Sequence, residues 1–203
     1  MKIGVMGGTF DPIHNGHLIA AEYARTSLNL DKIIFIPSGT HPFKNNKNIS
    51  EPNKRKDMIL LAIDSNNYFK ISSIEINRMG TTYTIDTIME LREEYKRDEI
   101  YFIIGSDILF ELEKWKGFKE LIGLCKFILL YRPGQEENID KKIKDLEYYN
   151  IQIKKVKSPL IEISSTEIRN RVNNKLSIKY LVPESVEQYI LKYDLYSGEK
   201  IYE

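Results

Sequence analysis

Residues 7–18 read GGTFDPIHNGHL, and they separate a short apolar run, Lys2–Met6, from a longer helical pattern, Leu18–Leu28. Glycines at 7 and 8 permit positive φ and let a ligand approach the backbone closely. The free N–H groups of the helix that follows favour an anion. The stretch matches neither the Walker loop nor G-x-G-x-x-G. It predicts a different kind of anion site, placed between a strand and a helix.

The rest of the chain alternates strand-like and helix-like patterns. Buried strands are predicted at Lys32–Ile36, Ile100–Ile104 and Phe127–Leu130, and further strands at Ile71–Asn77 and Gln152–Val156. The predicted helices are Leu18–Leu28, Lys54–Ser65, Thr84–Tyr95, Ser106–Leu124 with a break at Gly117, Asn138–Tyr148, Ser165–Val172 and Pro183–Tyr193. This alternation predicts an α/β fold, an open parallel sheet flanked by helices. We expect one core over residues 1–157 and a small helical subdomain, packed on it, over 158–203.

Composition limits the classes of function. The 203 residues contain 30 Lys plus Arg against 29 Asp plus Glu, a net charge of +1, which disfavours a nucleic-acid-binding protein. The longest apolar runs fall far short of the ~20 residues that span a bilayer, and the first residues do not resemble a signal peptide. The single Cys125 cannot form an intrachain disulfide. We expect a cytoplasmic protein without a membrane or nucleic-acid partner; a homo-oligomer stays open.

Two of the three histidines, His14 and His17, lie in residues 7–18, which we call the opening stretch. At the start of a helix this spacing puts both rings on one side, where each can donate to a phosphate oxygen, and Gly16 leaves room for the phosphate. Two alternatives are that the pair only caps the helix, or that it binds zinc together with His41. The glycine turn directly after a strand favours the phosphate site.

The opening stretch resembles the nucleotidyltransferase signature with its H-x-G-H motif, and most of all that of bacterial nicotinate-nucleotide adenylyltransferases. The resemblance implies a Rossmann-like sheet on which the signature holds the ATP triphosphate. Residues 163–169, ISSTEIR, match a second family motif, I-S-S-T-x-I-R, which implies another phosphate clamp. Alone, this segment is a capping box that starts a helix at Ser164. The implied ATP-binding residues are Gly7, Gly8, Thr9, Phe10, His14, His17, Ser164, Ser165, Thr166 and Arg169, and the implied catalytic ones are His14, His17 and Arg169.

A further motif, Gly105-Ser106-Asp107, ends a predicted strand. Ligands of open parallel sheets bind at the carboxyl ends of strands, so Asp107 should face the same crevice as the histidines. A carboxylate there suits ribose hydroxyls or a bridging magnesium ion, but Asp107 could also cap the next helix. The family resemblance assigns Gly105 and Asp107 to the adenosine side of ATP.

The second substrate is expected to contact residues elsewhere in the chain. Trp115 has charged neighbours, which suits an exposed ring that stacks on a heterocycle, although a core position is the alternative. By resemblance it stacks on nicotinate, and the helix that opens at Tyr83 and Thr84 accepts the nicotinate carboxylate on its N–H groups. Lys44 and Arg132 are loop cations that could simply be solvated. By resemblance both bind the substrate, Lys44 near its phosphate and Arg132 as part of the family's R-P-G element.

The resemblance therefore implies transfer of the adenylyl group of ATP to nicotinate mononucleotide in NAD biosynthesis, with release of pyrophosphate. A phosphate monoester is already anionic at neutral pH, so in-line attack needs no general base. Magnesium is expected to arrive with ATP rather than in a metal site built by the protein. The alternatives are a preference for nicotinamide mononucleotide or phosphopantetheine, a cytidylyltransferase that uses CTP, and a nucleotide sensor without catalysis.

The first prediction concerns His17. Removing one preorganised donor raises a reaction barrier by roughly 3 to 4 kcal/mol. His17→Ala should therefore lower the turnover of ATP and nicotinate mononucleotide by about 10²-fold or more, with an unchanged circular dichroism spectrum. A variant that turns over like the wild type would refute the role of His17.

Overall fold

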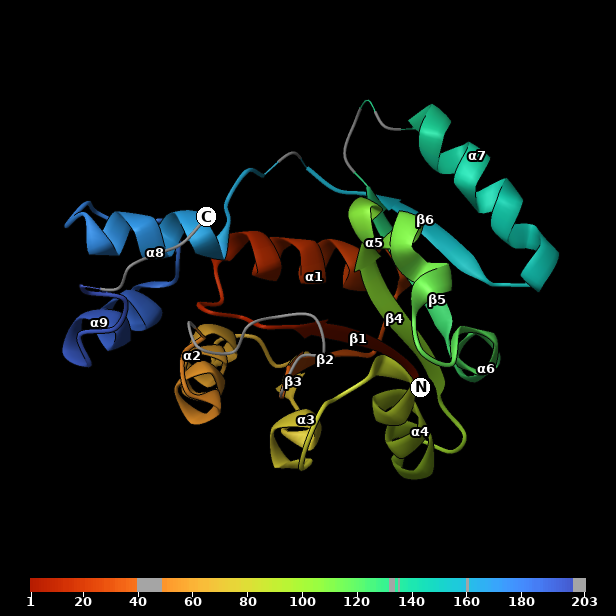
Figure 1. Ribbon diagram of the computed structural model, residues 1–203, viewed down its shortest axis with the longest axis horizontal. Coiled ribbons are helices and arrows are strands. Elements are labelled where there is room, and N and C mark those ends of the chain that lie inside the picture. The colour runs from red at the N-terminus through yellow and green to blue at the C-terminus, as the bar shows by residue number, and fades with distance from the viewer. Residues whose placement is uncertain (40–48, 132–133, 135, 160, 199–203) are drawn as a thin grey trace.

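One parallel sheet forms the centre of the molecule. The computed structural model describes residues 1–39, 49–131, 134, 136–159 and 161–198. Within them the sheet has six strands in the order β3-β2-β1-β4-β5-β6, and each neighbouring pair is parallel (Figure 1). The strands are β1 (Lys2–Gly8), β2 (Lys32–Pro37), β3 (Phe69–Ile71), β4 (Glu99–Gly105), β5 (Lys126–Tyr131) and β6 (Ile153–Lys157).

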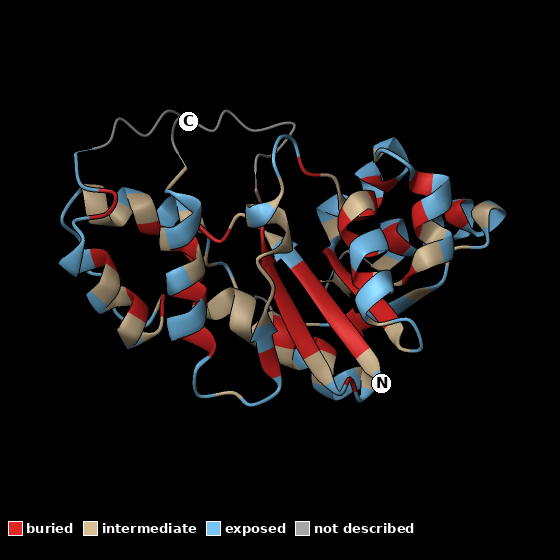
Figure 2. Cartoon of the chain, turned by 90° about the horizontal axis from the view of Figure 1, so that it is seen from below, coloured by how far each residue is buried: buried red, intermediate tan, exposed pale blue. Residues whose placement is uncertain are grey.

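Helices cover both faces of this sheet, because its central strands are apolar on both sides. In β2, Ile33 and Phe35 belong to one apolar cluster, whereas Ile34 and Ile36 belong to the other. Figure 2 shows the buried central strands between the helices. The first cluster is covered by α1 (Asn15–Leu28), α2 (Pro52–Ile63), α8 (Ser165–Asn173) and α9 (Glu184–Lys192). The second is covered by α3 (Ile74–Asn77), α4 (Thr84–Glu94), α5 (Ser106–Glu111), η2 (Leu112–Lys114), α6 (Phe118–Leu124), α7 (Glu136–Leu146) and η3 (Glu147–Tyr149).

The strand order creates a crevice between two neighbouring strands. β1 pairs with β2 on one side and with β4 on the other, so the connections that leave β1 and β4 run to opposite faces. The carboxyl ends of the two strands are therefore left uncovered between their connections, the position at which open α/β sheets bind ligands. The Rossmann-like parallel sheet that the sequence predicts is confirmed.

One predicted strand, Ile71–Asn77, is wrong beyond its first residue. The strand β3 ends at Ile71, and Ile74–Asn77 forms the short helix α3. Tertiary contacts explain the difference: the carbonyl of Glu75 lies against Gly39, where even a Cβ would approach to 2.3 Å, and the Glu75 carboxylate accepts the Thr87 hydroxyl of α4 (2.8 Å). The predicted break at Gly117 is confirmed, and this glycine has a φ of +66°.

The segment after β6 shares its apolar core with the sheet. Buried Ile168 of α8 and Ile190 of α9 belong to the same cluster as Met6 and Phe10 near the end of β1. Ser185 donates to the carbonyl of Leu61 in α2 (3.1 Å). The helices of this segment are thus packed on the core; the boundary between 157 and 158 stays a prediction.

Two other expectations from composition concern the single cysteine, Cys125, and the absence of a membrane-spanning segment. Burial raises the pKa of the Cys125 thiol to about 12, so the thiolate that reacts or binds metal is scarce at neutral pH. No helix in the described ranges has both the length and the apolar character needed to cross a membrane.

Arg55 of α2 joins three segments at the carboxyl edge of the sheet. Its guanidinium is buried and donates to the carbonyls of Thr9 (2.8 Å), Ser38 (2.8 Å) and Ser50 (3.0 Å). These carbonyls belong to the turn after β1, the residue after β2 and the residues before α2. A single cation therefore bonds three carbonyls that take no part in the hydrogen bonds of the sheet or the helices.

The second prediction follows from this contact. Arg55→Met keeps most of the apolar stem but leaves three carbonyls without their donor, so it should lower the free energy of unfolding by about 3 kcal/mol or more. Urea denaturation measures this loss. The control is Arg97→Met at an exposed position, which should change stability by less than about 0.5 kcal/mol. Equal losses in both variants would contradict the assignment.

Candidate active site

A cavity of about 500 Å³ opens at the carboxyl ends of β1 and β4. It brings together His14 and His17 of the opening stretch, Asp107 of α5, and Ser164 and Ser165 at the start of α8. Its other lining residues are Met6, Gly7, Gly16, Ile19, Ala20, Ile103, Ile104, Gly105, Ser106, Leu130, Ser158, Pro159, Ile161 and Ile163. Motifs 150 residues apart in the sequence thus share one cavity.

The two histidines are stacked at the start of α1. His14 is the N-cap residue, and its ring lies 3.6 Å from that of His17, with 24° between the ring planes. The Nδ1 atom of His17 accepts the backbone N–H of His14 (3.3 Å), so the proton of neutral His17 belongs on Nε2. Nδ1 of His14 is buried and has no hydrogen-bond partner within the described residues. A neutral imidazole has one N–H donor, so each ring can offer one donor to a ligand.

Burial keeps both imidazoles neutral in the free protein. It lowers the pKa of His14 to about 4, from an ordinary value of 6.5. Burial, together with the neighbouring His14, also holds the pKa of His17 well below the ordinary range. Two stacked imidazolium ions would repel each other, so the pair is a set of neutral donors until an anion arrives.

The glycines of the opening stretch do not supply the positive φ that was expected of them. Positive φ is not found at Gly7 or Gly8 but at Phe10, with φ of +50°. A Cβ at Gly8 would approach the Phe10 ring to 3.1 Å, so this glycine makes room for the buried ring. A Cβ at Gly16 would lie 3.0 Å from Nδ1 of His14, so Gly16 first accommodates the stacked histidine rather than a phosphate.

The start of α8 is bonded to the opening stretch. Ser164 is the N-cap, and its hydroxyl accepts the N–H of Glu167 (3.1 Å), as the capping-box pattern predicts. The Ser165 hydroxyl donates to the carbonyl of Pro12 (2.8 Å). Arg169 donates to the carbonyl of Asp11 (2.7 Å) and to the exposed Thr166 hydroxyl (3.3 Å). This second motif therefore fixes the position of the first.

Asp107 does not cap α5. The N-cap is Gly105, which makes no side-chain cap, and Asp107 occupies the first helical turn. Its side chain is exposed and lines the cavity beside Gly105. The alternative interpretation of Asp107 as a helix cap is thus wrong, and its carboxylate is free to face a ligand.

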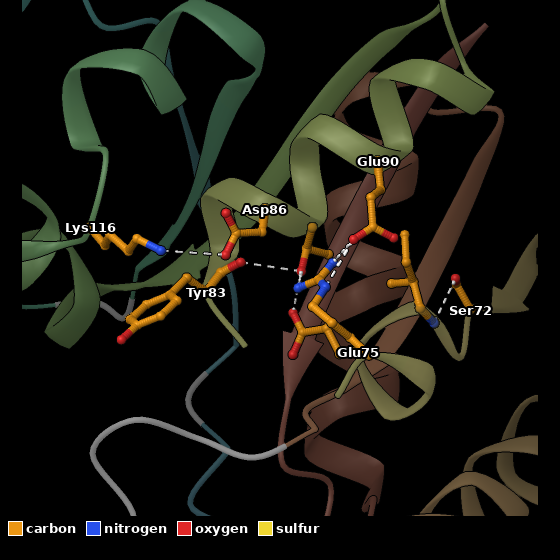
Figure 3. Close-up of polar contacts among 9 residues, drawn as sticks. Ser72, Glu75, Tyr83, Asp86, Glu90 and Lys116 are labelled. Carbon is orange, nitrogen blue, oxygen red and sulfur yellow. Dashed lines mark hydrogen bonds and ion pairs between the residues drawn. The ribbon is translucent and has the colours of Figure 1, made fainter. Parts of the chain in front are cut away.

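The residues expected to bind the second substrate lie together on the α4 side of the sheet. Tyr83 is the N-cap of α4, Thr84 is its first residue, and the Lys116 ammonium lies 4.1 Å from the centre of the Tyr83 ring. Figure 3 shows Lys116 directed at Asp86, 3.7 Å away. Trp115 is half-buried and meets the Phe102 ring edge-on at 5.9 Å, so it combines a packed edge with partial exposure.

This second group is separate from the cavity but close to its wall. Tyr83, Thr84 and Trp115 do not line the cavity of 500 Å³, nor do Gly8, Thr9, Phe10, Thr166 and Arg169. Phe102 connects the two places, because a Cβ at Gly7 would lie 3.4 Å from its ring and Trp115 packs against the same ring. Lys44, His41 and Arg132 lie outside the described residues. The zinc alternative, which needs His41, is untested for that reason.

Known proteins resemble this chain over almost its whole length. Residues 5–171 match the family model described as cytidylyltransferase-like. A probable nicotinate-nucleotide adenylyltransferase of Thermoanaerobacter sp. (strain X514) is 46% identical over 98% of this chain and 96% of its own length. The chain belongs to the nicotinate-nucleotide adenylyltransferase family. Another member, the protein of that name from Clostridium novyi (strain NT), is 41% identical over 96% of this chain and 98% of its own length.

Solved structures support the fold of this family member. The nicotinic acid mononucleotide adenylyltransferase of Plasmodium falciparum, complexed with NaAD, superposes with a TM-score of 0.77. That match covers 96% of this chain and 97% of the other, at 23% identity, which shows the shared fold. The family that the sequence motifs indicate is confirmed, although the individual site residues are not tested by these matches.

Sequence reasoning missed several residues of this family member's site. Leu130 at the end of β5 could have been found, because every parallel strand ends at the same edge of the sheet. Ser158 and Ile161 carry no sequence signal, since they reach the cavity only through the path of the chain between β6 and α8. Asp11 lies within the signature, but its bond to Tyr196 and the bonds of Arg55 to Thr9 and Ser38 join segments distant in sequence, so no local pattern marks these contacts.

The third prediction concerns the pH dependence of stability. Because the pKa of His14 is about 4 in the folded protein and near 6.5 when unfolded, the unfolded chain takes up the proton first. Stability is thus full above pH 6.5 and falls as the pH drops toward 4, by about 1.4 kcal/mol per pH unit for each such histidine. His14→Asn should show a shallower slope between pH 6 and 5 in urea denaturation without phosphate. Equal slopes would contradict a neutral His14.

Proposed function

We propose that the protein transfers the adenylyl group of ATP to nicotinate mononucleotide, giving nicotinate adenine dinucleotide and pyrophosphate. One observation carries the proposal: a single cavity joins two histidine N–H donors, the start of α8 and a free carboxylate. Donors and a carboxylate that line one cavity suit a polyphosphate with an attached ribose. The names of the relatives, at 41 to 46% identity, support the same substrates.

In this mechanism the protein positions two anions and compensates charge. The substrate phosphate attacks the α-phosphorus in line, and negative charge grows on the departing pyrophosphate. The Nε2–H of His17 and the ring N–H of His14 donate to these oxygens, as do the N–H groups at Ser165 and Thr166. Arg169 adds positive charge next to them. No protein base is needed, because the attacking phosphate is already ionised.

The residues of the cavity fit a magnesium ion that arrives with ATP. A protein-built cage needs several convergent ligands, and no group of three His, Cys, Asp or Glu side chains converges within the described ranges. Asp107 is one exposed carboxylate on the cavity wall, and one carboxylate with water and phosphate oxygens is the ligand set that Mg²⁺ commonly has with nucleotides. When bound, the ion would neutralise charge on the phosphates.

The α4 side of the crevice suits the nicotinate ring and its carboxylate. Trp115 offers a partly exposed indole, and the first turn of α4 after Tyr83 offers backbone N–H donors. A carboxylate accepts from these donors on both oxygens, whereas an amide would place its NH₂ against them. We propose this mismatch as the basis of preference for nicotinate over nicotinamide. Lys44 and Arg132, outside the described residues, remain assigned to substrate binding by resemblance, Lys44 to the substrate phosphate.

The fourth prediction tests the substrates directly. Pyrophosphate release from ATP should be fast with nicotinate mononucleotide and at least about tenfold slower with nicotinamide mononucleotide. It should be at background with phosphopantetheine, and CTP should not replace ATP. The readout is an enzyme-coupled pyrophosphate assay.

Two outcomes would overturn the proposal. Faster release with any other acceptor would reassign the substrate. Tight ATP binding without release in any mixture would make the protein a nucleotide sensor.

A further inference from the structure

Tyr196 binds the opening stretch from the far end of the described chain. Its ring is 3% exposed, and its hydroxyl donates to Oδ1 of Asp11 at 2.7 Å across 185 residues. Its φ is +66°, in the left-handed region that a bulky side chain seldom adopts. A strained residue persists only where its surroundings hold it, and such strain clusters at functional sites.

Neighbouring hydrogen bonds hold this strained turn in place. The N–H of Leu195 donates to the carbonyl of Ile190 in α9 (3.0 Å), and the N–H of Gly198 donates to Oδ1 of Asn173 in α8 (3.0 Å). Two helices therefore fix the backbone on both sides of Tyr196. The result is a phenol that is presented to Asp11 in one orientation.

Asp11 connects this phenol to the catalytic histidines. Its carboxylate is 2% exposed, and its second oxygen accepts the N–H of Ser50 (3.0 Å), while its carbonyl accepts Arg169 (2.7 Å). The preceding residue, Phe10, meets the His17 ring edge-on at 5.0 Å. A short path of contacts thus leads from Tyr196 through Asp11 and Phe10 to His17.

We propose that Tyr196 is a positioning residue for adenylyl transfer, because its hydroxyl fixes Asp11 and thereby sets the orientation of His17 toward the polyphosphate. The effect on turnover rests on the proposed function, whereas the effect on the histidine rings does not. Burial, and then the charge of Asp11, raises the pKa of the phenol well above its ordinary value, so it stays a donor.

A second tyrosine provides a matched control. The hydroxyl of Tyr189 in α9 donates to Oδ2 of Asp57 in α2 at 2.9 Å. Tyr189→Phe and Tyr196→Phe each remove one hydroxyl that donates to an aspartate. Both of these hydrogen bonds join the segment after β6 to the core. Only Tyr196 bonds to the opening stretch. The Tyr189 bond is exposed and the Tyr196 bond is buried, so the two variants can differ in stability, which urea denaturation measures for each. A positioning effect is the change in the histidine rings of the folded protein, expected only in Tyr196→Phe.

The fifth prediction combines a spectroscopic and a kinetic readout. The chain has three histidines, so ¹⁵N imidazole NMR spectra are simple to assign. Tyr196→Phe should shift the ring signals of His14 and His17 in the free protein, and Tyr189→Phe should leave them unchanged. The kcat of Tyr196→Phe with ATP and nicotinate mononucleotide should fall by about tenfold or more, since small misplacements of reacting groups are costly.

The possible results separate the two proposals. Unchanged His14 and His17 signals in Tyr196→Phe overturn the positioning role, as do equal shifts or equal losses of kcat in both variants. A wild-type protein without activity on these substrates removes the proposed function, while the spectra still decide the role of Tyr196. If Tyr196→Phe is partly unfolded, low-temperature spectra resolve the folded signals separately, and these alone are compared.

Discussion

The turn between β1 and α1 depends on hydrogen-bond donors from outside itself. The carbonyls of Thr9, Asp11 and Pro12 are bonded by the side chains of Arg55, Arg169 and Ser165 rather than by backbone N–H groups. Buried carbonyls without partners are strongly unfavourable, so the turn keeps its shape only while these side chains are in place. The stacked histidines directly follow the turn, so their positions depend on the same side chains.

The same side chains link the fold to the candidate chemistry. Arg169 and Ser165 belong to the motif assigned to the phosphates, yet in the free protein they bond to backbone carbonyls. Under the proposed function, a polyphosphate would meet donors that are already oriented, which reduces the entropy lost on binding. The neutral state of His14 and His17 complements this arrangement, because an approaching anion favours their protonation at the moment of binding.

Much of this arrangement could be predicted from local sequence, and the remainder could not. Continuous apolar runs mark strands that are buried on both faces, and the histidine spacing correctly indicates two rings on one side of a helix. The strand predicted over Ile71–Asn77 is wrong beyond Ile71, because contacts with Gly39 and Thr87 outweigh the alternation of apolar and polar residues. The left-handed φ at Phe10, rather than at a glycine, is imposed by its packing. The bond from Tyr196 to Asp11 is likewise a tertiary contact with no local signature.

The long sequence separations of these bonds also have a consequence for synthesis on the ribosome. Residues 9–14 emerge early, whereas their partners Ser165, Arg169 and Tyr196 follow 153 to 185 residues later. Arg55 is synthesised early, but until Ser165 and Arg169 follow, the carbonyls of Pro12 and Asp11 lack their donors. A nascent chain can therefore pair its early strands before the turn has all the bonds that fix its shape, so the candidate site is completed late in translation.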